Sequence, residues 1–386
     1  MAKINRRTAL LTLGGGSALV LGAGGLWAAT RNPAKALEPW RAAQSGDWPD
    51  HRLRVFAHAI LAPSPMNMQP WRIRLVGDDA ASLFCDPKSL LPASDPFDRQ
   101  TTIGFGAFIE IARIAAAEQG LNLDVSAFPE GPALPNLDQR PVAHIKFTTA
   151  ASVKKDKLYP AIKERSTNRA NYDTDAQLTS TDLDALRAQA VPGTEIDATA
   201  SRDRVSLLRT ICIDALVAEA ATDAIWDQQI SHTRIGRKEI EAQPDGIDIA
   251  GPGPELFQSL GLLNRQMLKK RTSAAARSAI NAGAEAAATA MAFAWVVTPS
   301  NSRDDQLAAG AAFVRLHLEA AARRIALHPI SAPLQEIPQL ASSRSAVNDA
   351  IRRSEDRKIQ MFVRLGKSAE APHSPRWPLE SRLVNA

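Results

Sequence analysis

The sequence predicts an α+β protein built from two related halves. Two apolar runs follow an early helical run and are joined by Gly77-Asp78-Asp79, as expected of a β-hairpin. Long alanine-rich runs with helical spacing of apolar residues lie between the predicted strands. One of these helical runs recurs later in the chain, and a strand-like run follows both copies. We therefore expect two halves, residues 37–150 and 151–386, each combining helices with a sheet.

The repeat matches Phe108-Ile109-Glu110-Ile111 with Phe313-Val314-Arg315-Leu316, and three alanines follow each copy after three residues. A glycine precedes each copy and a strand-like run follows it: Gly106 and Val142–Phe147, then Gly310 and Met361–Leu365. Alanine-rich helices also match by coincidence. If the match reflects a duplication, the chain is a fused pair joined near residues 148–158.

The first 36 residues are set apart from the fold. Arg6-Arg7 precede an apolar, glycine-rich run from Ala9 to Ala29, and Ala34-Lys35-Ala36 offers small residues at a cleavage spacing. The pattern resembles a twin-arginine signal, which implies export to the periplasm or beyond through the twin-arginine machinery. The alternative is an uncleaved membrane anchor through residues 8–29, which would be the chain's one membrane contact.

Charge and cysteine content exclude several classes. The formal net charge is +5, but residues 1–36 carry five basic and no acidic residues, so the remainder is neutral and has no basic stripe for nucleic acid. Cys85 and Cys212 allow at most one internal disulfide. His51 and His58 share a predicted helix face, but no third ligand stands at metal spacing, so we expect no metal site.

Asp50 is a suitable N-cap for a helix over residues 51–61, and the strands Trp71–Val76 and Ala81–Cys85 follow it. Residues 104–119 predict a buried helix in which two glycines serve close helix packing rather than a phosphate loop. Further expected elements are a strand over 142–147 and helices over 157–164, 180–188, 205–226 and 283–297. Residues 227–280 are rich in charge, glycine and proline, and are either a lid over a site or a surface segment.

The stretch from Ala62 to Trp71 predicts a binding loop. Its three prolines stop the preceding helix, while Ser64, Asn67 and Gln69 offer hydrogen-bond donors and acceptors beside the indole of Trp71. Such a loop suits a planar ligand with polar edges. The simpler interpretation is a proline-rich helix exit without a ligand.

This loop resembles the APSxxNxQPW signature of the nitroreductase family of flavin mononucleotide (FMN) proteins. The spacing of Arg165, Thr167 and Arg169 resembles the family's R-x-S-x-R, and Pro372–Leu379 resembles its closing segment. The resemblance touches residues 52–76, 104–120, 158–173 and 359–384. It implies mixed or antiparallel sheets flanked by helices, and FMN binding by seven residues: Ser64, Asn67, Gln69, Arg165, Thr167, Arg169 and Arg376.

In that comparison Arg165 and Thr167 hold the FMN phosphate, Arg376 completes the phosphate site, and Arg169 faces the pyrimidine edge of the flavin. A guanidinium and a hydroxyl suit a phosphate, and a cation near flavin N1 and O2 stabilises the reduced ring. Outside that resemblance, each arginine is an ordinary solvated charge.

The order of the motifs departs from the family. Arg165 lies about a hundred residues after Ala62, and each half carries one motif and lacks the other. The pattern resembles the fused-dimer, Acg-like subgroup, in which a lid covers the flavin. It implies one composite site and one FMN per chain, in a monomer or weak dimer.

The resemblance implies an oxidoreductase that passes hydride or electrons through flavin N5 to a small acceptor, without a catalytic side chain. NAD(P)H is an uncertain donor for an exported protein. The alternative is a protein that sequesters or stores FMN under its lid without turnover. A hydrolase is excluded because G-x-S-x-G, a metal triad and a Cys-His pattern are all missing from the sequence.

Overall fold

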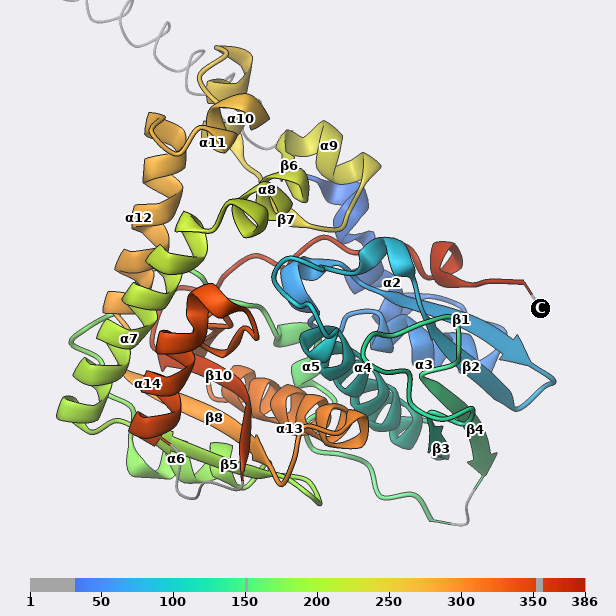
Figure 1. Ribbon diagram of the computed structural model, residues 1–386. Coiled ribbons are helices and arrows are strands. Elements are labelled where there is room, and N and C mark those ends of the chain that lie inside the picture. Colours follow the sequence, from blue (N-terminus) through green and yellow to red (C-terminus); the bar gives the residue numbers. More distant parts are fainter. Residues whose placement is uncertain (1–31, 150–151, 352–356, 386) are drawn as a thin grey trace, which may run out of the picture.

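The computed structural model describes residues 32–149, 152–351 and 357–385 of the 386-residue chain. Helices pack on two four-stranded antiparallel sheets, which confirms the predicted α+β class (Figure 1). The predicted signal, up to residue 31, lies outside the described residues. No helix in the described ranges is long and apolar enough to cross a membrane.

The first half contains the sheet β1-β2-β4-β3 and the long helix that packs on it. Its elements are η1 (Ala34–Leu37), α2 (Glu38–Ser45), α3 (His51–Ala59), η2 (Pro65–Asn67), β1 (Trp71–Val76), β2 (Ala80–Cys85), η3 (Pro87–Ser89), α4 (Arg99–Glu118), β3 (Leu121–Ala127) and β4 (Ala143–Thr149). Asp50 caps α3 by accepting a hydrogen bond from the backbone N–H of Arg52, as predicted.

The second half contains the sheet β5-β8-β10-β9. Its first elements are α5 (Ala161–Glu164), α6 (Ser180–Arg187), β5 (Glu195–Thr199), α7 (Arg202–Ala221), α8 (Asp223–Ser231), β6 (Thr233–Ile235), α9 (Gly236–Ala242), β7 (Ile247–Ile249), α10 (Pro252–Ser259), α11 (Arg265–Lys269) and α12 (Ala274–Ala288). They are followed by β8 (Ala292–Thr298), α13 (Arg303–Ala322), β9 (Ala326–Pro329), η4 (Ala332–Leu334), η5 (Pro338–Leu340), α14 (Ala341–Ile351), β10 (Lys358–Gly366) and η6 (Leu379–Arg382).

The two sheets have the same strand order. In each, the strand after the long helix is an edge strand, it pairs with the next strand in sequence, and that strand pairs with the one before the helix. The halves differ in one connection. A turn of three residues joins β1 to β2, whereas residues 200–291 separate β5 from β8 and form what we call the insertion.

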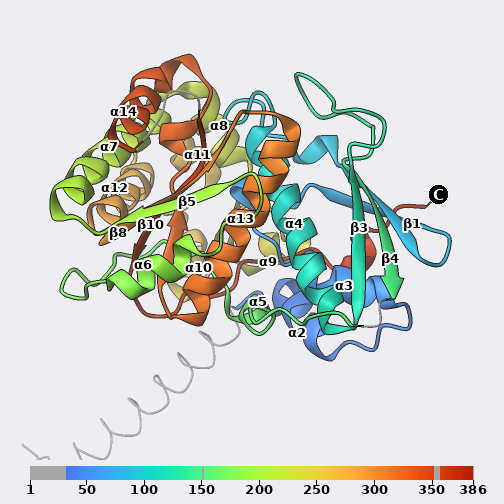
Figure 2. The same cartoon turned by 90° about the horizontal axis from the view of Figure 1, so that it is seen from below.

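The long helices α4 and α13 lie side by side between the sheets (Figure 2). A Cβ at Gly106 would lie 2.0 Å from the Leu307 carbonyl oxygen, and a Cβ at Gly310 would lie 2.0 Å from the Ile103 carbonyl oxygen. The contact is therefore reciprocal, and only glycine permits the backbones to approach so closely.

This reciprocity corrects the alignment of the repeat by one residue. It equates Gly106 with Gly310, whereas the sequence match paired Phe108 with Phe313. The first residues of the helices, Arg99 and Arg303, are related by the glycine spacing as well. The sequence match was displaced because alanine-rich helices align almost equally well one residue apart.

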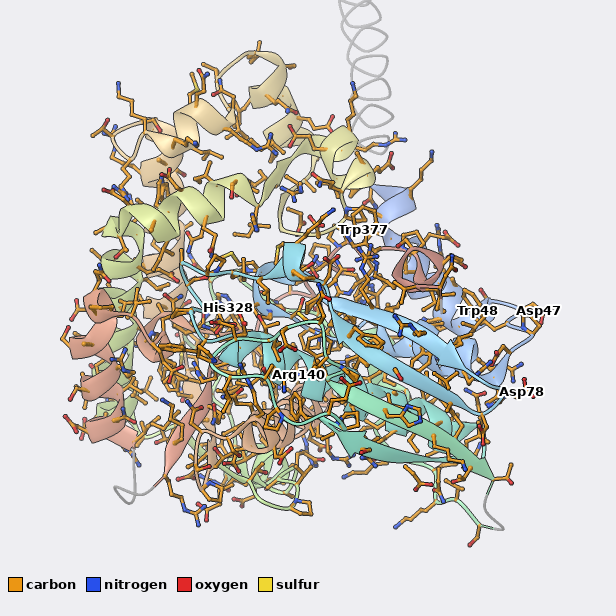
Figure 3. The ribbon with its side chains drawn as sticks, turned by 45° about the vertical axis from the view of Figure 1, so that its right-hand side comes forward. Asp47, Trp48, Asp78, Arg140, His328 and Trp377 are labelled. Carbon is orange, nitrogen blue, oxygen red and sulfur yellow. The ribbon has the colours of Figure 1, made fainter. Side chains whose placement is uncertain are left out.

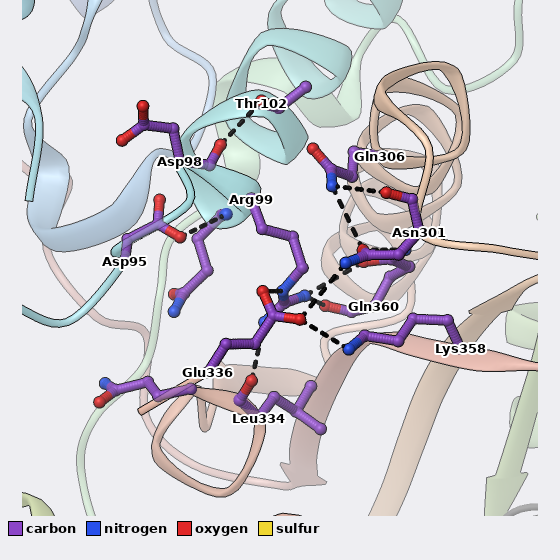
Figure 4. Close-up of polar contacts among 12 residues, drawn as sticks. Asp95, Asp98, Arg99, Thr102, Asn301, Gln306, Leu334, Glu336, Lys358 and Gln360 are labelled. Carbon is purple, nitrogen blue, oxygen red and sulfur yellow. Dashed lines mark hydrogen bonds and ion pairs between the residues drawn. The ribbon is translucent and has the colours of Figure 1, made fainter. Parts of the chain in front are cut away.

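Both arginines reach across to the opposite half. Arg99 donates to the Gln360 and Leu334 carbonyls at 2.8 and 3.0 Å, and its Nε lies 3.3 Å from a carboxylate oxygen of Glu336 (Figure 4). Arg303 donates to the Pro135 carbonyl at 2.8 Å and the Ala133 carbonyl at 3.2 Å. Buried hydrogen bonds thus join the halves on both sides of the helix pair.

Three expected elements are wrong or incomplete. The helix expected over 283–297 ends at Ala288, and Ala292–Thr298 form β8, a central strand buried on both faces. The helix expected over 205–226 breaks at Thr222 into α7 and α8, and the helix over 157–164 is confined to four residues. The strands β3, β5 and β9 were not predicted. Alanines alternating with large side chains in β8 hid its period of two, because both of its faces are apolar.

The C-terminal tail leaves β10 and crosses to the first half (Figure 1). Val384 N–H donates to the Ile73 carbonyl at 2.9 Å beside the edge strand β1, and Arg72 donates to the Ser381 carbonyl at 2.8 Å. The tail thereby carries Arg376 into the region of the predicted binding loop.

Both cysteines are buried thiols without a disulfide. His58 contacts Arg54 and Tyr159, and the described residues contain no cluster of three metal-ligating side chains.

Candidate functional site

A cavity of about 260 Å³ lies between the two halves and is lined by both. Its walls come from the predicted loop, the start of α4, the insertion and the segment that follows β9. The lining is largely apolar and includes a few polar groups. Among its residues are Ser64, Met66, Leu91, Ile103, Thr167, Arg169, Leu216, Glu219, Gln229, Ile247, Phe313, His328, Ile330, Gln335 and Met361. An apolar cavity with a few converging polar groups is the usual form of a small-molecule site.

Three of the seven predicted site residues line this cavity. Ser64 comes from the loop of the first half, and Thr167 and Arg169 come from the segment after α5 in the second half. The structure thus brings together motifs that are about a hundred residues apart in sequence. Ser64 Oγ also accepts a hydrogen bond from the Gln69 N–H at 2.9 Å, which closes the loop on itself.

The loop has a strained backbone. Met66, Asn67 and Gln69 have φ values of 45°, 58° and 50°, in the left-handed region that residues other than glycine rarely adopt. The surrounding hydrogen bonds must hold this geometry, and loops of this kind concentrate at binding sites.

Asn67 and Gln69 make some of the hydrogen bonds that hold the loop, and they do not line the cavity. Asn67 Nδ2 donates to the Pro375 carbonyl at 3.0 Å. Gln69 is fully buried; its Nε2 donates to the Pro244 carbonyl at 2.7 Å and its Oε1 accepts from the Trp377 N–H at 2.9 Å. Gln69 therefore joins the loop to both the insertion and the C-terminal tail.

Arg165 and Arg376 also lie behind the loop rather than in the cavity wall. Both guanidinium groups donate to the Leu61 carbonyl, at 2.8 and 3.0 Å, and Arg376 donates to Asn67 Oδ1 at 2.6 Å. Leu61 follows α3, where helix carbonyls lack partners within the helix. The two arginines thus complete the end of α3 and lie above the Trp40 ring at 5.6 and 5.3 Å from its centroid.

These two guanidinium groups are short of negative charge. Each is only 2% exposed, and within the described chain neither has an ion pair or a partner for its Nε. Burial lowers the pKa of Arg165 to about 10, and burial with repulsion from Arg165 lowers the pKa of Arg376 well below its usual range. Two neighbouring buried cations would gain stability from an added anion.

At the cavity itself, Arg169 is accessible to solvent although neighbouring elements surround it, and this enclosure lowers its pKa, opposed by the nearby Asp248 carboxylate on β7. His328 lies at the end of β9, in the interior between the halves (Figure 3). Its Nδ1 accepts a hydrogen bond from Arg364 Nε at 3.0 Å, which leaves the proton on Nε2. Burial and the two arginines hold the His328 pKa well below its usual range, so the ring is neutral.

The second polar place consists of Glu219, Gln229 and Gln335, which we call the polar corner. Gln335 Nε2 and the Gln229 side chain both hydrogen-bond the Glu219 carboxyl. Burial raises the Glu219 pKa, and in the described part of the chain no cation forms an ion pair with it. Gln335 Oε1 is buried and lacks a partner there.

The sequence analysis missed His328 and the polar corner. Glu219 lies on α7, Gln229 on α8 and Gln335 just after η4, so more than a hundred residues separate the ends of this set. No short motif contains them. The signal that was available is the buried polar residue in an otherwise apolar helix, because Glu219 stands among the alanines at the end of α7.

The geometry can therefore bind a planar, mostly apolar molecule against the loop. Arg169 and the hydroxyls of Ser64 and Thr167 offer donors to an electron-rich edge, and the amides and carboxyl of the polar corner offer further hydrogen bonds. Gln229 and Ile247 belong to the insertion and cover part of this space.

Comparison with known proteins gives partial matches, and no family model matches the chain. The Mycobacterium tuberculosis protein acg, provisionally named an NAD(P)H nitroreductase, is 37% identical over 92 residues, covering 24% of this chain and 26% of acg. Rv3131 from the same organism, also provisionally named an NAD(P)H nitroreductase, is 28% identical over 185 residues, covering 45% and 47% of the two chains. The chain thus spans between a quarter and a half of the length of these relatives.

Solved structures give weaker likenesses. A protein of Anabaena variabilis, provisionally identified as a nitroreductase, has a TM-score of 0.41 at 12% identity, covering 80% of this chain and 82% of that one. The FMN-dependent nitroreductase NfnB of Mycobacterium smegmatis has a TM-score of 0.36 at 18% identity, covering 57% and 94%. Over at most 45% of its length, the chain is similar in sequence to proteins named as nitroreductases.

Proposed function

We propose that the chain is an exported, FMN-dependent oxidoreductase of the nitroreductase type that binds one FMN between its halves. The observation that carries the proposal is the composite cavity, to which the first half contributes Ser64 and the second half contributes Thr167 and Arg169. The names of acg and Rv3131 support the same activity. When bound, the flavin would supply hydride or electron transfer to a small acceptor.

The residues present fit FMN in two respects. The apolar walls suit an isoalloxazine ring, and Arg169 supplies a cation for its electron-rich edge. The phosphate needs cations that lack carboxylate partners, and Arg165 and Arg376 each have a buried Nε–H without a partner in the described residues. We assign the phosphate to the side of the loop that faces this pair.

The test begins with the absorption spectrum of the purified full chain and its ratio of FMN to protein, for which we expect one. We expect Arg165→Met and Arg376→Met each to weaken FMN binding at least about tenfold, because a charge-assisted hydrogen bond contributes about 1.5–3 kcal/mol. A protein that neither carries nor takes up FMN would refute the proposed function. An FMN dissociation constant unchanged in both variants would refute only the phosphate assignment.

Arg303→Met is the matched control. Arg303 is also buried and donates mainly to backbone carbonyls, but it lies at the start of α13 and does not line the cavity. Its loss should lower the free energy of unfolding while FMN affinity stays within about twofold. Equal loss of FMN in all three variants would mean that binding reports general stability.

A second function, storage of FMN without turnover, is favoured by the way the insertion is fixed. Gly246 N–H donates to the Asn67 carbonyl at 3.3 Å and Gln69 donates to the Pro244 carbonyl, so the segment carrying Ile247 is attached to the loop. The two functions differ in kinetics. Flavin that NAD(P)H or dithionite bleaches and that passes electrons to a quinone or nitroaromatic supports the oxidoreductase; flavin that resists reduction supports storage.

We also propose that the chain arose by duplication and fusion, and that it is a monomer or weak dimer exported by its twin-arginine segment. The identical strand orders and the reciprocal glycine contacts support the duplication. Light scattering tests the oligomeric state. Cell fractionation of the full chain and an Arg6→Lys, Arg7→Lys variant tests export, and mass spectrometry of the exported protein identifies its first residue.

A further inference from the structure

Resting on the proposed function, we propose that the polar corner of Glu219, Gln229 and Gln335 is the acceptor subsite, and that it binds a neutral ring whose edge oxygen is a carbonyl when oxidised and a hydroxyl when reduced. A quinone and its hydroquinone form such a couple. Nothing in the motifs assigns a role to these three residues.

The position of the corner carries the first step. All of these residues line the cavity, but Arg169 is close enough to His328 to lower its pKa, whereas only burial, Gln335 and Gln229 act on the Glu219 carboxyl. Arg169 and His328 therefore mark one place on the wall, and the polar corner marks another. The cationic place suits the electron-rich flavin edge. The polar corner remains for a second, neutral ligand.

The hydrogen bonds of the corner carry the second step. Glu219 is 9% exposed and hydrogen-bonds with two amide side chains, yet no cation among the described residues forms an ion pair with it. Burial raises the pKa of this carboxyl, and the proposed complex uses its protonated form, which has one O–H to donate. A carbonyl oxygen of a ligand in the cavity can accept that hydrogen.

The third step concerns the hydrogen-bond donor that Gln335 lacks. Gln335 is 2% exposed, its Nε2 is used by Glu219, and its Oε1 lacks a donor in the described chain. A buried acceptor without a donor costs about 1–3 kcal/mol. A ligand hydroxyl would donate to it, so Glu219 matches the oxidised oxygen and Gln335 matches the reduced one.

The apolar lining of the cavity further limits the class of ligand. Leu91, Ile103, Leu216, Phe313 and Met361 supply apolar surface to the same cavity, and charged acceptors would lose their hydration there without a counter-ion from Glu219 or Gln335. A quinone accepts hydrogen bonds and donates none, so Gln335 Oε1 gains a partner only when the ligand is reduced and carries a hydroxyl.

The test is anaerobic titration calorimetry of the full chain as purified with naphthoquinone, naphthohydroquinone and naphthalene. We expect naphthoquinone to bind at least about tenfold tighter than naphthalene, and Glu219→Leu to remove most of that difference. Glu219→Leu should weaken the quinone more than the hydroquinone, and Gln335→Met should weaken the hydroquinone more than the quinone. Equal effects of both variants on both ligands, or no effect, would overturn the proposal.

Glu319→Gln is the control, because Glu319 is a buried carboxylate on α13 that pairs with Arg323 and does not line the cavity. It should leave all three dissociation constants unchanged. Where Glu219→Leu does not fold, Gln335→Met and the infrared measurement below decide the test. Glu219→Gln, whose amide still donates, should keep quinone affinity within about threefold, and a larger loss would contradict the donor role of Glu219.

Infrared difference spectroscopy supplies a readout independent of binding strength. A protonated-carboxyl band that shifts when naphthoquinone is added and is missing in Glu219→Gln supports the subsite. A band that is insensitive to the quinone overturns it. FMN content, read from absorbance, separates these outcomes from failure of the flavin assignment, because loss of FMN leaves the quinone titration measurable.

Discussion

The two sheets share one strand order, but the halves use the connection between their first two strands differently. The first half closes β1 and β2 with a turn and places its polar loop before β1. The second half extends the corresponding connection into the insertion, which supplies Glu219, Gln229 and Ile247 to the cavity wall. The comparison teaches that the shared unit of sheet and long helix forms the interface through α4 and α13, and that the insertion adds part of the cavity wall to it.

The interface glycines test the shared part of the comparison and should give the largest effect. We expect Gly106→Ala and Gly310→Ala each to destabilise the protein by several kcal/mol or prevent folding, because the new Cβ would lie 2.0 Å from a backbone oxygen of the opposite helix. Chemical unfolding measures the loss. Similar losses of unfolding free energy in the two variants would support the reciprocal contact, and a large difference would contradict it.

Gly283→Ala is the matched control, since Gly283 lies inside α12 and a Cβ there would meet nothing within 4 Å. Alanine favours a helix over glycine by about 1 kcal/mol, so this variant should be stabilised. A destabilised Gly283→Ala would show that helix glycines here are sensitive for reasons other than the contact between α4 and α13.

The glycine contact also shows how far sequence reasoning reached. Local patterns predicted α3 with its Asp50 cap and the β1–β2 hairpin, because alternation and capping act over a few residues. They failed at β8, whose burial on both faces removes the polar alternation, and at Thr222, whose extended backbone separates α7 from α8.

The candidate site divides in the same way. Of the residues that the motifs predicted, Ser64, Thr167 and Arg169 line one cavity. Asn67 and Gln69 instead hold the loop by hydrogen bonds on its side away from the cavity. A motif records which residues occur together but not which side of the loop each one faces. His328 and Glu219 belong to no local pattern and are brought to the cavity by the assembled fold.

Gln69 tests the insertion, which is the part in which the halves differ, because its side chain links the loop of the first half to the insertion of the second. We expect Gln69→Met to cost about 2 kcal/mol of unfolding free energy, because the Trp377 N–H loses its buried acceptor and the Pro244 carbonyl loses its donor. Hydrogen exchange of residues 244–249 should accelerate more than that of β1. Unchanged exchange there would show that the insertion does not depend on Gln69.

The last expected effect appears only below about pH 6.5 and concerns equivalent positions on the long helices. In the corrected alignment, the buried His317 of α13 corresponds to Arg113 of α4, which is exposed. His317 Nε2 lies 3.0 Å from the Ser166 carbonyl, and burial with the nearby Arg165 lowers the His317 pKa to about 3. A histidine next to the site is thus kept neutral where the other half carries a solvated cation.

Because the His317 pKa is lowered in the folded state from its usual 6.5, the unfolded chain binds more protons between these two values. The stability from the neutral ring is therefore fully present above about pH 6.5 and is lost as the pH falls toward 3. We expect the unfolding free energy of wild type to fall in this window by up to about 1.4 kcal/mol per pH unit more than that of His317→Phe. Parallel slopes for wild type and His317→Phe would mean that the difference between the equivalent positions carries no energetic weight.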